Sequence, residues 1–193
     1  MKVRLKTARA VALTWLVPAL ALALAADPPW IDEARSVATS VPPKLLSILT
    51  AEIAKGGPEG AIAVCRDEAP KLAKAASETT GWKVRRVSLR NRNPKAVPDA
   101  WERATLEEFD RRAAAGANPA SLERAEAVQE DGRTVWRYMR ALPVQEFCLN
   151  CHGMPDRLSP AVKERLRELY PDDQGVGYSV GQIRGAMTIS KPQ

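Results

Sequence analysis

Two cysteines and a histidine near the C-terminal end of the chain form the run Cys148-Leu149-Asn150-Cys151-His152. A C-x-x-C-H run is the attachment signature of c-type haem, in which the two thiols add to the vinyl groups of one porphyrin. The imidazole that follows can bind the iron as its proximal ligand. His152 is the only histidine in the chain. The run therefore predicts one covalent haem c, held by Cys148 and Cys151, with His152 on the iron.

The same residue types support two other chemistries. Cys65, Cys148, Cys151 and His152 make a Cys3His set, which suits tetrahedral zinc in a structural module without a redox role. A C-x-x-C pair can also act as a redox dithiol. Cys65, the one cysteine outside the C-x-x-C-H run, is either a small core residue or a second axial ligand of the iron.

The first 25 residues are typical of a secretory signal peptide. Basic residues from Lys2 to Arg9 precede an apolar stretch, Ala10 to Ala25, that ends in small residues suited to cleavage. The alternative is an uncleaved membrane anchor, for which the apolar stretch is short. We expect export to the periplasm, which agrees with haem c because bacteria attach that cofactor outside the cytoplasm. The chain then divides into a signal peptide, residues 1–25, and a single haem-binding domain, residues 26–193.

The positive charge of the chain comes largely from that segment. The formal net charge is +6, and without the four basic residues of the first 25 the chain has 25 basic and 23 acidic residues. No basic face with interleaved aromatic residues is present, which argues against a nucleic-acid partner. No further set of residues suggests acid–base or nucleophilic catalysis, so we do not expect an enzyme.

The elements that must position these residues begin with helices. Apolar residues at helical spacing predict a helix from Ile31 to Ala54, kinked or divided at Pro42-Pro43. Gly56-Gly57 ends this helix, and a second follows from Pro58 to Thr79. Cys65 falls on the apolar stripe of the second helix, so it is expected on a buried helix face.

Strands dominate the rest of the chain. Asp131-Gly132 is the strongest hairpin signal in the sequence. The further expected elements are strands over 82–89, 123–130, 133–142 and 183–190, and helices over 98–115 and 160–169. This order predicts an α+β domain with a mainly antiparallel sheet.

Several segments in a fixed order are similar to those of one protein family. They are Ala61-Ile62-Ala63-Val64-Cys65, the stretch from Arg86 to Pro94, Asp99-Ala100-Trp101-Glu102, the stretch from Tyr138 to Leu142, the C-x-x-C-H run, Tyr170-Pro171-Asp172-Asp173 and Gly185-Ala186-Met187. Each is weak alone, but their order and number are specific. On these segments the chain resembles the DUF3365 family, also called the Tll0287-like haem family.

The resemblance implies both a fold and a ligand set. It implies a PAS-like, mainly antiparallel sheet with N-terminal helices packed around one haem c. It also implies that Cys65 is the second axial ligand of the iron, opposite His152. Arg86, Arg92 and Tyr138 lie in the similar segments and are candidate contacts for the haem propionates or the pocket.

Axial ligand identity then sets the expected chemistry. A thiolate stabilises ferric iron, so His/Cys ligation predicts a low potential, whereas ligation by Met139 or Met187 predicts a higher one. An open sixth position is the remaining alternative. We expect a periplasmic electron carrier or a redox or gas sensor. Its partner is then a redox protein or a separate signalling protein, a small gas is a candidate ligand, and the membrane is involved only if the signal segment stays uncleaved.

Overall fold

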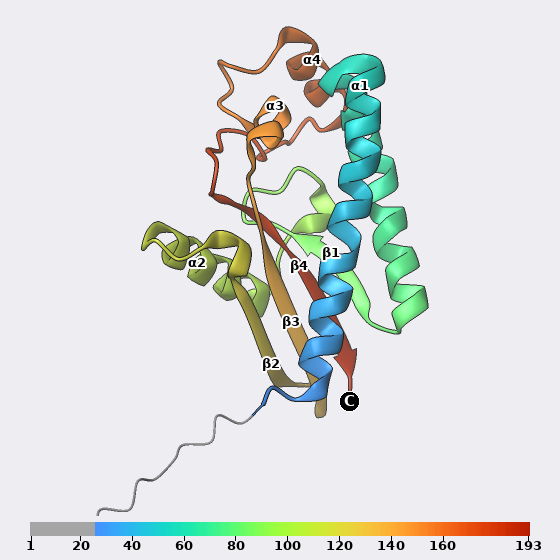
Figure 1. The fold of residues 1–193 in the computed structure, drawn as a ribbon, viewed down its shortest axis with the longest axis vertical. Coiled ribbons are helices and arrows are strands. Elements are labelled where there is room, and N and C mark those ends of the chain that lie inside the picture. Colours follow the sequence, from blue (N-terminus) through green and yellow to red (C-terminus); the bar gives the residue numbers. More distant parts are fainter. Residues whose placement is uncertain (1–25) are drawn as a thin grey trace, which may run out of the picture.

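The sheet has four strands, all antiparallel, in the order β1-β4-β3-β2 (Figure 1). The computed structural model describes residues 26–193, so the expected signal peptide lies outside the described residues. The strands are β1 (Lys83–Val87), β2 (Glu123–Glu130), β3 (Arg133–Pro143) and β4 (Ile183–Pro192). Together with the helices they make the α+β fold that the sequence predicts.

The hairpin between β2 and β3 turns where the sequence indicates. Asp131 and Gly132 have φ angles of 49° and 74°. Positive φ at both central residues is the backbone of a type I′ turn, whose twist matches that of two antiparallel strands. Asp131-Gly132 therefore sets the register in which Glu130 pairs with Arg133.

The longest helical segment, α1 (Pro29–Thr80), is interrupted once by non-helical backbone at Gly56 and Gly57. Gly57 has a φ of 75°, which costs glycine little, and the chain reverses there into a second arm (Figure 1). This is the break that the sequence predicts. In contrast, Pro42-Pro43 does not divide the first arm, because its backbone stays helical there. Packing of this arm on the sheet retains the helix despite the two missing backbone donors.

The two faces of the sheet are covered by different helices (Figure 1). On one face the first arm of α1 packs over the strands, and the cluster comprises Ala34, Val37, Ala38, Val41, Trp82, Val84, Tyr138, Met187 and Ile189. On the other face lies α2 (Ala100–Ala114), and the cluster comprises Val87, Leu106, Phe109, Leu122, Met139, Ala141, Ile183 and Ala186. Burial of these two apolar faces provides most of the driving force for folding.

A third cluster joins the end of the sheet to the second arm of α1. Two helices, α3 (Leu149–His152) and α4 (Pro160–Leu169), lie between the end of β3 and the start of β4 (Figure 1). Ile62 of α1 packs there with Leu158, Val162, Leu166 and Tyr170. The C-x-x-C-H run is thereby held next to the arm that carries Cys65. Among residues 26–193, no helix combines the length and the apolar character that a membrane span requires.

Candidate functional site

The C-x-x-C-H run folds as two short consecutive turns. Cys148 ends the 3₁₀ turn η3 (Glu146–Cys148), and Cys151 and His152 lie on α3, about one turn further on. The Sγ atom of Cys148 is 3.4 Å from the backbone nitrogen of Gln145, and that of Cys151 is 3.8 Å from the carbonyl oxygen of Pro58. Both thiols and that of Cys65 are free. Each cysteine is therefore available for covalent attachment or ligation.

Gly153 lets the chain leave this turn. It ends α3 with a φ of −66°, so it is not needed for a left-handed backbone. A Cβ at this position would lie only 2.6 Å from the carbonyl oxygen of Leu149. The site therefore excludes any side chain here because of the close approach of the backbone.

The imidazole of His152 is held by the loop that connects α4 to β4. Its Nδ1 atom lies 2.6 Å from the carbonyl oxygen of Gly175. The backbone nitrogens of Gly177 and Tyr178 donate to the carbonyl oxygens of Gly153 and His152, at 2.7 and 2.9 Å. A proton on Nδ1 that is donated to Gly175 leaves the lone pair of Nε2 free, as a metal-ligating histidine requires.

Burial is the main reason why His152 stays neutral. It holds the pKa of the imidazole well below its usual range, and the charges of Arg184, Arg92 and Arg86 add to this effect. A neutral imidazole is the form that binds iron.

Three arginines, Arg86, Arg92 and Arg184, surround the site with positive charge. Arg92 is 7% exposed, donates to Asp173 at 3.0 Å and donates to the carbonyl oxygen of Cys151 at 2.6 Å. It therefore stabilises the backbone of the C-x-x-C-H run, and its guanidinium is already hydrogen-bonded to Asp173 and Cys151. Within residues 26–193, Arg86 forms no hydrogen bond or ion pair through its half-buried side chain. Arg86 is thus the guanidinium best suited to an added anion.

Cys65 lies near the same arginines. Burial raises the pKa of its thiol, while the charges of Arg86, Arg92 and Arg184 act in the opposite direction. For Cys151, burial raises the pKa to about 11, and Arg92 partly opposes it. The structure therefore brings Cys65 and the C-x-x-C-H run into one electrostatic environment.

Tyr138 lies in the core under α1. Its hydroxyl donates to Glu123 at 2.6 Å, and its ring is fully buried in the cluster under α1. Burial and this hydrogen bond raise the pKa of Tyr138 to about 12. The structure thus places Tyr138 in the core, with its hydroxyl bonded to Glu123.

The two candidate methionines lie on opposite faces of the sheet. Met139 is buried under α2, whereas Met187 is buried under α1 and pairs with Arg86 across β1 and β4. Since Cys65 lies on α1, Met187 is the one of the two that shares its side of the sheet.

Sequence reasoning missed Arg184 and the loop residue Gly175. Arg184 is buried, and its guanidinium lies 3.1 Å from Nδ1 of His152. The available signal was a charged residue at the start of a strand, directly before Gly185-Ala186-Met187. The glycine-rich loop supports the histidine through its backbone, and a Cβ at Gly175 would lie 2.5 Å from the Arg184 guanidinium.

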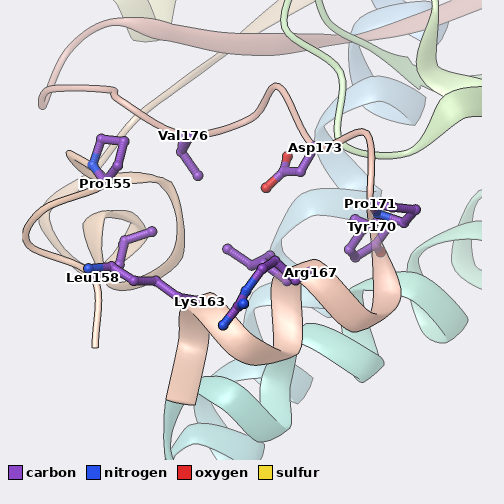
Figure 2. Close-up of a pocket in the computed structure, with 9 residues that line it drawn as sticks. Pro155, Leu158, Lys163, Arg167, Tyr170, Pro171, Asp173 and Val176 are labelled. Carbon is purple, nitrogen blue, oxygen red and sulfur yellow. The ribbon is translucent and has the colours of Figure 1, made fainter. Parts of the chain in front are cut away.

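The described residues do not assemble a zinc site. Among residues 26–193, no three histidine, cysteine, aspartate or glutamate side chains gather as a metal ion requires. A cavity of about 370 Å³ lies instead beside α4, between the loops on either side of it (Figure 2). Its walls include Leu158, Leu166, Tyr170, Asp173 and Val176, but none of the three cysteines or His152.

Comparisons with known proteins identify a family and a similar fold. The model of the Tll0287-like family matches residues 16–192. The crystal structure of the cyanobacterial heme-protein Tll0287 is similar, with 27% sequence identity and a TM-score of 0.65, over 87% of this chain and 98% of that one. The search of curated proteins returned no match.

Proposed function

The chain belongs to the Tll0287-like family, and from this premise we propose an exported protein with one covalent haem c that acts in electron transfer or in redox or gas sensing. The observation that supports haem best is the 2.6 Å contact between Nδ1 of His152 and the carbonyl oxygen of Gly175. It orients the imidazole and leaves Nε2 free, within a run whose spacing is that of haem c attachment. The similar structure is itself that of a heme-protein.

Each part of the site has a role in holding the cofactor. Cys148 and Cys151 would form the two thioether bonds, and both thiols are free. His152 and Cys65 would both bind the iron, and Arg86 would bind a propionate. Arg92 is held by Asp173 and the carbonyl oxygen of Cys151, so its part is to fix the motif. Bound haem supplies an iron that accepts or gives one electron.

The charges of the site tune that electron exchange. A thiolate ligand is anionic and favours the ferric state, so we propose a low potential. Burial raises the pKa of Cys65, and the nearby arginines oppose that rise and favour its anionic form. We propose electron transfer with a partner protein in the periplasm as the simplest function, because an iron that exchanges one electron is sufficient for it.

Redox or gas sensing is a second candidate, favoured by the burial of Cys65. Burial is the main cause that raises the pKa of its thiol, and a neutral thiol is a weaker ligand than a thiolate. Reduced protein that binds CO would support a sensor, which then needs a separate signalling protein. A reduced spectrum unchanged by CO would support a carrier.

Covalent attachment is tested by exporting the full chain from a host that matures haem c. A Soret band that survives acid-acetone extraction is the expected result. It should disappear when Cys148→Ser and Cys151→Ser are combined, and persist in Asn150→Ala, which changes an exposed residue inside the same run. A colourless protein with one bound zinc would contradict the proposal.

A further inference from the structure

Arg184 is the buried charge nearest to the proximal side of the site, and we propose that it raises the redox potential of the haem iron through His152. This inference rests on the proposed function. It assigns Arg184 as a positioning residue that sets the charge around the ligand. The thiolate of Cys65 would then lower the redox potential of the iron, and the guanidinium of Arg184 would raise it.

The position of the guanidinium is fixed by several hydrogen bonds. Arg184 is 6% exposed, and its Nε lies 3.1 Å from Nδ1 of His152. Its Nη1 donates to the hydroxyl of Ser88 at 2.9 Å and to the carbonyl oxygen of Arg90 at 3.1 Å. Ser88 is itself buried, and its hydroxyl donates to the carbonyl oxygen of Arg184 at 2.8 Å. The cation therefore cannot turn away from the imidazole without losing these bonds.

Nδ1 of His152 lies close to both the carbonyl oxygen of Gly175 and Nε of Arg184, but it can form a hydrogen bond with only one of them at a time. It cannot donate to the carbonyl oxygen of Gly175 and also accept from Arg184, because a ring nitrogen is either protonated or a lone-pair acceptor. When Nε2 is the metal ligand, Nδ1 carries the proton and donates to Gly175. Arg184 then acts through its charge, while Ser88 and Arg90 keep the guanidinium in place.

No acid neutralises this charge directly. Among the ion pairs of residues 26–193, none includes Arg184, and the nearby carboxylate of Asp173 is paired with Arg92 at 3.0 Å. Burial, with the nearby charge of Arg86, lowers the pKa of Arg184 to about 9, so the guanidinium is still a cation at neutral pH. In a poorly solvated site, such a cation favours the state with one more electron. The buried charge therefore favours ferrous over ferric iron.

The midpoint potential of the haem-loaded protein tests this inference. Arg184→Gln should lower the ratio of reduced to oxidised protein by about tenfold at a fixed ambient potential, which is about 59 mV for one electron. Arg184→Lys keeps the charge and should recover most of the shift. Arg137→Gln is the matched control, because Arg137 is a partly buried arginine on β3 that pairs with Asp99 and Glu130. It should leave the potential unchanged.

Three results would overturn the inference. The first is an unchanged potential in haem-loaded Arg184→Gln, and the second is an Arg184→Lys variant as shifted as the glutamine variant. If Arg184→Gln does not accumulate, Ser88→Ala is measured in its place. Ser88→Ala removes one acceptor of the guanidinium, which can then move away from the imidazole, so the potential should also fall. No shift in Ser88→Ala is the third. Failure to attach haem in the unmodified protein would instead contradict the proposed function.

Discussion

The buried ion pair between Arg92 and Asp173 is expected to be a major determinant of stability at the site. Its atoms are 3.0 Å apart, and the two side chains are 7% and 9% exposed. In Asp173→Asn the charge of Arg92 stays buried without its partner, near Arg86 and Arg184. Breaking a buried pair on one side typically costs about 3–5 kcal/mol. For a chain of this size that corresponds to a fall in Tm of roughly 6–20 °C.

Urea unfolding followed by far-ultraviolet circular dichroism measures this loss. The oxygen of asparagine can still accept the hydrogen bond that Asp173 Oδ1 receives from the backbone nitrogen of Gly175, at 2.7 Å. Its amide nitrogen replaces Oδ2, the acceptor of Arg92 Nε, so the change removes the ion pair with its hydrogen bond and keeps the loop contact. Glu164→Gln is the control, since it breaks an ion pair with Arg167 in which the side chains are 73% and 75% exposed. That pair should contribute at most about 1 kcal/mol.

A loss in Asp173→Asn no larger than that of the Glu164→Gln control would refute this reasoning. It would mean that water or another group already screens Arg92. Because Arg92 also donates to the carbonyl oxygen of Cys151 at 2.6 Å, we expect the loss of stability to be accompanied by a lower yield of covalent haem.

Two further predictions concern a backbone contact and a carboxylate. Gly153→Ala places a Cβ 2.6 Å from the carbonyl oxygen of Leu149, so we expect less covalent haem per protein by absorbance, and normal loading would contradict the steric argument. Hydrogen bonds from Arg35 and Tyr138 lower the pKa of Glu123, so its stabilising effect is present above the unfolded pKa of about 4.3 and is lost as the pH falls through the lower folded value. Unfolding curves from pH 7 to 2.5 should therefore show weaker acid sensitivity in Glu123→Gln than in the unmodified chain, and parallel curves would contradict it.

Local signals predicted the elements that local chemistry controls. Gly56-Gly57 breaks α1 because its backbone needs a conformation that glycine adopts easily, and Asp131-Gly132 forms its hairpin for the same reason. Pro42-Pro43 is the opposite case. There the packing of the first arm on the sheet outweighs the local preference, and no local pattern reports that packing.

Contacts between distant segments were the part that the sequence could not supply. Arg92 pairs with Asp173 from 81 residues away, and Arg184 reaches Ser88 from 96 residues away. The sequence shows the position of a charged residue along the chain but does not indicate which group that residue contacts in the fold. For the same reason the hydrogen bond from Tyr138 to Glu123 in the core could not be predicted from the segment that contains Tyr138.

The ferric absorption spectrum of the exported protein, before and after Cys65→Ala, tests the proposed ligand set most directly. The unmodified protein should show a low-spin ferric haem, and the low-spin bands should be lost in Cys65→Ala. Val64→Ala, which shortens the neighbouring side chain on the same arm of α1, should keep them. A low-spin spectrum that is identical in Cys65→Ala and the unmodified protein would contradict thiolate ligation by Cys65.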